Sequence, residues 1–168
     1  MSEERALQPT QEDWAAAAEI GSTPALWAQS RMDATVPAEL LQQVIDAARD
    51  GLPNECCGLL VGPAYAGRGG VPTRYVALRN AAESPYRYLI DPDEQLRVMI
   101  EIDDADEVVW GIVHSHVAAP AVPSATDIGL AFYPLSLYLI CSLAEPAPVV
   151  RAWSIREGAV LEVPLSVS

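Results

Sequence analysis

The feature that most restricts the fold is the stretch Val108–His116, in which an apolar run is followed by His-Ser-His. A short apolar run of this kind predicts a buried strand. Alternate side chains of a strand lie on the same face, so His114 and His116 share a face at its C-terminal end. They are the only two histidines in the chain. The sequence therefore predicts a core strand that ends in two neighbouring imidazoles.

The flanking segments predict a mixed α/β domain. A helix is expected between Pro37, which suits a first turn, and Gly51, which ends the apolar stripe. A second helix is expected from Asp91, with Pro92 in its first turn and Glu94 completing a capping box. Its expected buried face consists of Leu96, Met99 and Ile100. Further strands are expected after residues 53–56 and at 75–78, 137–143, 149–155 and 159–163.

Composition limits the domain organisation and the kind of partner. The chain has 168 residues, 51% of them hydrophobic, which is enough for one domain with a sizeable core. We expect residues 1–34 to form a loosely ordered or docked extension and residues 35–168 to form the domain. A net charge of −13 argues against binding to nucleic acid or to an anionic membrane surface. The acidic N-terminus lacks the pattern of a signal peptide, and the three cysteines do not suggest a disulfide framework, so a cytoplasmic location is expected.

The two histidines and a downstream aspartate form a candidate metal site. Two neutral imidazoles and the carboxylate of Asp127 are a ligand set that Zn²⁺ accepts, with a fourth position left for water. A second interpretation of Asp127 stands beside this one: Ser124 and Asp127 have the spacing of a capping box at the start of a short helix running towards Phe132. The two roles do not exclude each other.

A zinc hydrolase also needs a group that moves protons, and Glu55 is the candidate because it precedes an apolar strand. The alternative is an exposed loop glutamate, and spacing alone does not place Glu55 beside His114. Ser124 is a candidate donor to a developing oxyanion. Other hydrolase signatures are weaker: the chain lacks Gly-x-Ser-x-Gly and Pro-Cys-x-x-Cys, and Cys57 is expected to pack in the core.

Taken together, these residues resemble the JAMM (MPN-plus) zinc metallopeptidase motif. The motif residues are Glu55, His114-Ser-His116, then seven residues, Ser124, two residues and Asp127. The resemblance extends to the small bacterial, Mec-like branch over about residues 36–163. Its further elements are Pro53-Asn-Glu-Cys-Cys-Gly-Leu-Leu-Val-Gly, Asn80, Tyr88-Leu-Ile-Asp-Pro and Pro123-Ser-Ala-Thr-Asp-Ile.

The resemblance implies a JAMM/cytidine-deaminase-like fold, a curved mixed sheet flanked by helices. It implies Zn²⁺ held by His114, His116 and Asp127, with Glu55 as general acid/base and Ser124 as oxyanion stabiliser. One departure is Val117, where the family usually has proline; we expect this to tune the substrate groove and to leave metal binding intact.

The resemblance also suggests a substrate. Mec-type enzymes cleave cysteine or a related amino acid from the C-terminal Gly-Gly of a ubiquitin-like sulfur-carrier protein. The chain is short between Gly62 and His114, which leaves little room for the insertions of lysine-63-specific deubiquitinases and favours the sulfur carrier. Two alternatives stay open: a non-catalytic MPN-like interaction module and a more general deubiquitinase-like isopeptidase. The sequence does not indicate an oligomeric state.

Overall fold

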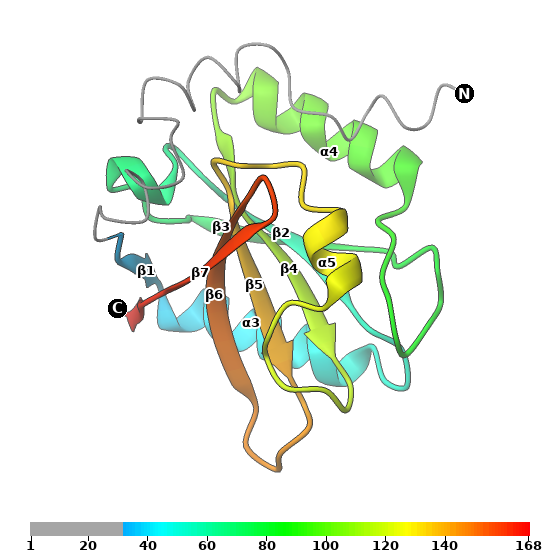
Figure 1. Cartoon of the computed structure of the whole chain (residues 1–168). Helices are drawn as coiled ribbons and strands as arrows, with labels where there is room; N and C mark the ends of the chain where they lie inside the picture. Colours follow the sequence, from blue (N-terminus) through cyan, green and yellow to red (C-terminus); the bar gives the residue numbers. More distant parts are fainter. Residues whose placement is uncertain (1–31) are drawn as a thin grey trace.

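A six-stranded mixed sheet forms the centre of the molecule in the computed structural model, which describes residues 32–168 (Figure 1). Its strand order is β3-β2-β4-β5-β6-β7; β4 and β5 are parallel, and the other neighbours are antiparallel. The strands are β2 (Cys57–Gly62), β3 (Arg74–Leu78), β4 (Val108–His116), β5 (Leu137–Ser142), β6 (Val149–Arg156) and β7 (Ala159–Val163). The predicted mixed α/β fold with a curved sheet and flanking helices is confirmed.

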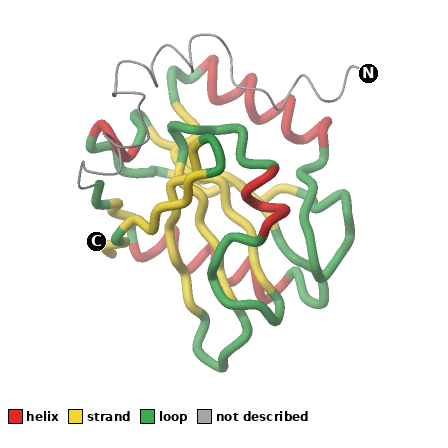
Figure 2. The backbone as a smooth tube through the Cα atoms, viewed as in Figure 1, coloured by secondary structure: helices red, strands yellow, loops and turns green. Residues whose placement is uncertain are grey.

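Helices cover both faces of this sheet, as Figure 2 shows. Helix α3 (Ala38–Asp50) packs on one face through its buried stripe of Leu40, Val44 and Ala48. Helix α4 (Pro92–Asp104) and the short α5 (Ala125–Gly129) contribute to the core on the opposite face. Both histidines of β4 belong to this second face, because β4 alternates along its length and Ile112 packs there.

Strand β4 is enclosed on both edges and both faces. It pairs with β2 on one side and β5 on the other, and its residues from Val109 to His116 are all buried. The nine residues of β4 coincide with the stretch predicted from the apolar run. The predicted closing strands β5, β6 and β7 and the predicted helix α3 are also found.

Helix α4 begins as expected but turns a different face to the sheet. The Asp91 carboxylate accepts hydrogen bonds from the backbone N–H groups of Asp93 and Glu94, as expected of a cap. The Glu94 carboxylate, however, accepts from the backbone N–H of Arg79, so the expected capping box is wrong.

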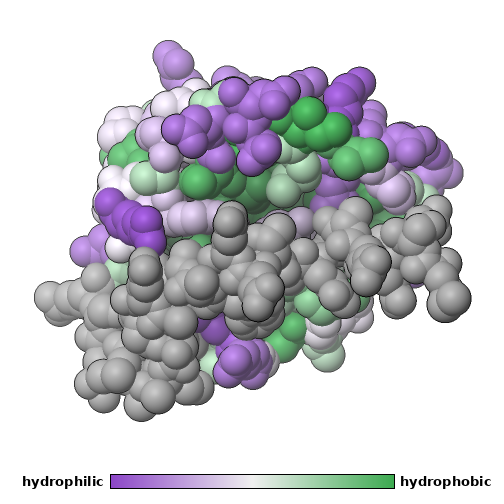
Figure 3. Space-filling view, turned by 90° about the horizontal axis from the view of Figure 1, so that it is seen from above, coloured by the Kyte–Doolittle hydropathy of each residue, from purple (hydrophilic) through white to green (hydrophobic). Residues whose placement is uncertain are grey.

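The expected buried face of α4 is wrong for two of its three residues, while the third, Met99, is half-buried and packs against the core. Leu96 and Ile100 are 57% and 52% exposed, and the buried positions are Gln95, Val98 and Ile102. Both the exposed set and the buried set recur at helical spacing. Packing of α4 on the sheet buries the set that includes Gln95. Figure 3, seen from the side on which α4 lies, shows hydrophobic residues exposed among hydrophilic ones.

Short elements complete the domain. Strands β1 (Ala34–Val36) and β8 (Leu165–Val167) pair in parallel and join the two ends of the described chain; neither was predicted. A 3₁₀ turn at Ala66–Arg68 lies in the Gly/Pro-rich loop. Helix α5 ends at Gly129, so it is shorter than the expected helix towards Phe132.

The extension predicted for residues 1–34 lies almost entirely outside the described residues. No helix within residues 32–168 is long and apolar enough to cross a membrane.

Candidate metal centre and active site

The end of β4 presents two buried imidazoles side by side. His114 is fully enclosed and His116 is 5% exposed, and their Nε2 atoms lie 3.2 Å apart. The Nδ1 atom of His116 lies 2.7 Å from the carbonyl oxygen of Pro120, which can only accept. His116 therefore carries a hydrogen on Nδ1, and when neutral it directs the Nε2 lone pair towards His114.

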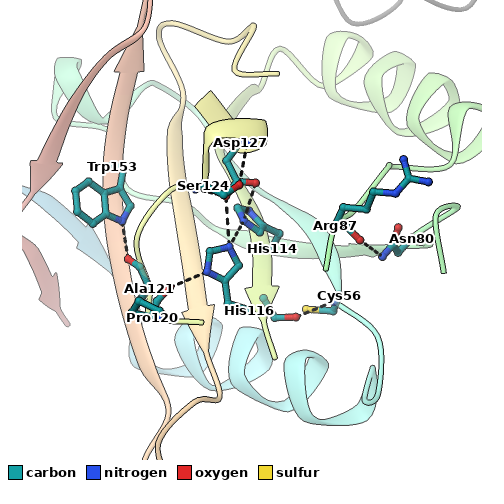
Figure 4. A network of polar contacts seen from close by, with 11 residues as sticks. Cys56, Asn80, Arg87, His114, His116, Pro120, Ala121, Ser124, Asp127 and Trp153 are labelled. Carbon is teal, nitrogen blue, oxygen red and sulfur yellow. Dashed lines mark hydrogen bonds and ion pairs between the residues drawn. The ribbon is translucent and has the colours of Figure 1, made fainter. Parts of the chain in front are cut away.

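Asp127 joins this pair from the first turn of α5 (Figure 4). One carboxylate oxygen lies 3.3 Å from Nε2 of His114, and the other lies 3.3 Å from Nε2 of His116. The same carboxylate accepts from the backbone N–H of Ser124, while the Ser124 hydroxyl accepts from the backbone N–H of Asp127. The capping box and the cluster thus coexist, and the cap fixes where the carboxylate points.

The charges of the three groups depend strongly on each other. Burial lowers the pKa of His114 despite the nearby carboxylate of Asp127. For His116, burial opposes the charged form, but hydrogen bonds to Asp127 and Pro120 outweigh it and raise the pKa. Burial also acts against ionisation of Asp127, yet hydrogen bonds from both histidines keep its pKa well below the usual range. The cluster therefore holds a carboxylate beside two imidazoles near neutral pH.

This donor set fits a divalent metal ion. One nitrogen or oxygen atom from each of the three side chains lies within 4.8 Å of the others. Ligand atoms around a tetrahedral metal with bonds of about 2.0–2.1 Å lie about 3.3 Å apart. The separations of 3.2 Å and 3.3 Å match this value. Converging lone pairs and a carboxylate need a positive charge between them.

Glu55 lies beside the cluster because of the strand register. Cys57 of β2 is opposite His114 of β4, and continuing this antiparallel register places Glu55 opposite His116. Glu55 is only 5% exposed, so it is not the exposed loop residue of the alternative interpretation. Burial raises its pKa to about 7; His116 opposes this shift and Asp127 adds to it. A carboxyl group with this pKa can both accept and donate a proton near neutral pH.

Ser124 is exposed at the mouth of the site. In the capping box its oxygen accepts a hydrogen bond, so its own O–H is still available as a donor. The structure thus brings together all five predicted site residues, from the segment before β2, the end of β4 and the start of α5.

Two further features of the site have no role predicted from the sequence. Tyr88 stacks on the ring of His114, with centroids 4.5 Å apart and an interplanar angle of 22°. Tyr88 also lines an apolar pocket between α4 and the sheet, so this one side chain contacts both the cluster and the pocket. The pocket is lined by Leu59, Tyr88, Leu89, Ile90, Gln95, Met99, Val109, Ile112, Leu130, Phe132, Tyr133 and Tyr138. A stacked aromatic side chain gives no periodic signal, so only resemblance drew attention to Tyr88.

Comparison with known proteins identifies the family to which this site belongs. Residues 37–156 match the family described as prokaryotic homologs of the JAB domain, Prok-JAB. The chain belongs to the Prok-JAB family. This match spans the whole site and most of the described chain, so the predicted membership in the JAB/MPN family is confirmed. The predicted enzyme class, a JAB-domain hydrolase, is confirmed by relatives named CysO-cysteine peptidase and Desampylase.

Similar proteins cover most of the Prok-JAB domain. The "CysO-cysteine peptidase" of Mycobacterium tuberculosis (strain CDC 1551 / Oshkosh) is 40% identical over 133 residues, covering 79% of this chain and 89% of that protein. A "Desampylase" of Haloferax volcanii is 34% identical over 112 residues, covering 64% and 79% of the two chains. The solution structure of protein DSY2949 from Desulfitobacterium hafniense has a TM-score of 0.70 and 37% identity, covering 80% and 92%.

Proposed function

We propose that this protein is a zinc peptidase that hydrolyses the amide bond after the C-terminal Gly-Gly of a ubiquitin-like sulfur-carrier protein, releasing cysteine or a related amino acid. The single observation that carries the proposal is the convergence of His114, His116 and Asp127 beside a buried glutamate. The name of the mycobacterial relative, CysO-cysteine peptidase, supports this choice of substrate.

Zinc bound by the three residues would supply a Lewis acid and lower the pKa of a water at its open position. The carboxylate of Glu55 takes a proton from the attacking water as its oxygen bonds to the glycine carbonyl carbon. Glu55 then donates that proton to the leaving amine as the C–N bond breaks. The raised pKa of Glu55 suits both steps, since neither transfer is strongly uphill near neutral pH.

Ser124 has the complementary role at the carbonyl oxygen. Its free O–H donates a hydrogen bond as that oxygen gains negative charge, while the capping box holds the hydroxyl in place. The carrier tail is expected to approach over the exposed side of α5. The apolar pocket beside Tyr88 suits a non-polar side chain of the substrate, because the residues lining it are almost entirely hydrophobic.

The proposal is tested with a purified carrier–cysteine adduct incubated with zinc-loaded protein. Mass spectrometry should show loss of one cysteine residue and appearance of a free Gly-Gly terminus. The variant Glu55→Ala should reduce turnover by about 10²-fold or more, since it removes the proton-transfer group. Full activity in that variant refutes the mechanism. Absence of bound zinc, together with no hydrolysis after zinc addition, would favour the interaction module.

A further inference from the structure

The loop between β3 and α4, residues 79–91, holds the backbone of Glu55. Glu55 precedes β2 and has no partner in the sheet ladder. Its N–H donates to the carbonyl oxygen of Ser84 at 2.9 Å, and its carbonyl oxygen accepts from the side-chain amide of Asn80 at 3.0 Å. Both backbone groups of the proposed proton carrier therefore depend on this loop.

One side chain organises the loop. The Asn80 amide nitrogen donates to the carbonyl oxygen of Glu55 at 3.0 Å and to that of Arg87 at 3.1 Å. Figure 4 shows the bond to Arg87. The Asn80 side-chain oxygen accepts from the N–H groups of Ala82 and Leu89, at 3.0 Å and 2.9 Å. An asparagine side chain has two donor hydrogens and two acceptor lone pairs, so all four are used. Two carbonyls on one side and two N–H groups on the other fix the orientation of the amide.

The same loop reaches the metal cluster from a second direction. Leu89, whose N–H is held by Asn80, directly follows Tyr88, which stacks on His114. The ends of the loop are fixed separately, since Arg79 forms an ion pair with Asp91 and its N–H donates to Glu94. Between these ends, the part of the loop that faces the site is held by the four bonds of the Asn80 side chain and by a backbone hydrogen bond from the Ala81 N–H to the Leu89 carbonyl oxygen at 2.7 Å.

We propose that Asn80 is a positioning residue of this enzyme, which holds the backbone of Glu55 so that its carboxyl group faces the scissile amide. This rests on the proposed function, because it assumes that Glu55 transfers protons in hydrolysis. Asn80 acts through Glu55 and has no contact with the substrate. Aspartate is not equivalent, since it replaces the two N–H donors with an oxygen facing two carbonyl oxygens.

The first test compares Asn80→Asp with Asn54→Asp in the zinc-loaded protein. Asn80→Asp keeps the acceptor oxygen and loses the donors. Asn54→Asp adds the same charge next to Glu55, and the Asn54 side chain has no hydrogen bond within residues 32–168. Asn80→Asp should lower kcat about 10- to 100-fold, as expected for a small displacement of a catalytic group. KM and zinc stoichiometry should change less than about 2-fold, and Asn54→Asp should leave kcat within about 3-fold of the wild type.

A double-mutant cycle separates positioning from general destabilisation. In a Glu55→Gln background, assayed by single turnover, Asn80→Asp should lower the rate by no more than about 2-fold, because the group it positions is gone. Additive losses would overturn the proposal, as would full kcat in Asn80→Asp or a loss expressed only in KM. If Asn80→Asp does not fold, the neutral Asn80→Ser serves in the same cycle with the same expected result.

A measurement without turnover distinguishes the two proposals. In metal-free protein, Asn80→Asp should speed hydrogen exchange of the Glu55 amide about 10-fold or more while leaving the Leu139 amide of β5 unchanged. An unchanged Glu55 amide refutes the positioning role. If the exchange effect is found but the wild type shows no hydrolysis, the positioning of Glu55 stands and the proposed reaction fails.

Discussion

Replacing Glu55 by glutamine should slow hydrolysis by about 10²-fold or more and at the same time stabilise the metal-free domain. The buried carboxyl group has a pKa raised to about 7, mainly by burial. Above that pH the folded state holds a charge that the unfolded chain hydrates better. Glutamine has nearly the same shape and no charge, so the folded variant does not lose stability by burying an ionised group.

The size and the pH dependence follow from the pKa. Neutral Glu55 contributes stability that is fully present below its unfolded pKa of about 4.5 and is lost as the pH rises towards about 7. At about 1.4 kcal/mol per pH unit, the raised pKa of Glu55 lowers the free energy of unfolding by about 1 kcal/mol at pH 5, where only the unfolded chain ionises, and by about 3 kcal/mol at pH 8. The Glu55→Gln variant lacks this dependence. Its Tm should therefore exceed that of the wild type by about 5–10 °C at pH 8 and by only about 2–4 °C at pH 5.

Thermal unfolding followed by circular dichroism in the presence of a chelator measures this difference. The control is Glu145→Gln, which removes an exposed carboxylate from the loop between β5 and β6 and should change stability by less than about 0.5 kcal/mol at either pH. A Tm gain that is the same at both pH values, or a Glu55→Gln variant less stable than the wild type at pH 8, would refute the reasoning.

Two further predictions concern the metal and the pocket. Zinc needs neutral imidazoles, and hydrogen bonds to Asp127 and Pro120 raise the pKa of His116 above its ordinary value of about 6.5 despite its burial. Zinc retention in equilibrium dialysis should therefore begin to fall while the pH is still above about 6.5, and it should continue to fall as the pH is lowered. Unchanged retention down to about pH 4 would contradict histidine ligation. Leu130 is 54% exposed at the rim of the apolar pocket. Leu130→Glu should raise KM about 10-fold with little change in zinc content, whereas the control Val160→Glu on the distant β7 should leave KM unchanged. Equal KM values for the two variants would exclude the pocket from substrate binding.

The most reliable predictions were those of elements whose local sequence pattern is compatible with one structure only. The apolar run before His114 predicts β4 with its bounds, because a strand buried on both faces is encoded by a continuous apolar run. The cap at Asp91 is confirmed for a similar reason, since aspartate followed by proline is a local signal that needs no tertiary contact. Local chemistry of this kind can be read without knowing the rest of the fold.

The errors occur where tertiary packing selects between equal local patterns. In α4, one stripe contains Leu96 and Ile100 and the other contains Val98 and Ile102, and only docking on β4 decides between them. The pairing of β1 with β8 joins segments about 130 residues apart, and strands of three residues have too little periodicity to be recognised. Both errors reflect non-local contacts.

In the candidate site, too, spacing predicted the locally encoded residues, but it did not predict the position of the residue placed by a non-local contact. The spacing of His114, His116 and Asp127 suggested a ligand set, because a strand end and a helix cap are both locally encoded. The proximity of Glu55 to that set depends on the pairing of β2 with β4, which no spacing within one segment reveals. Resemblance supplied the role of Glu55, and the register supplies its physical basis.

The segments that build the site differ in how many contacts hold them in place. His114 and His116 lie within a strand paired on both sides, and Asp127 is held by a reciprocal cap. Within the part of the chain that the structure describes, the backbone of Glu55 forms two hydrogen bonds, both to one irregular loop. A substitution that loosens this loop can move the proton carrier while the ligand set stays intact, because the loop bonds to the Glu55 backbone and, within residues 32–168, forms no hydrogen bond to the three ligands. Loss of turnover without loss of zinc is therefore the expected consequence of perturbing residues 79–91, and loss of both is the expected consequence of perturbing β4.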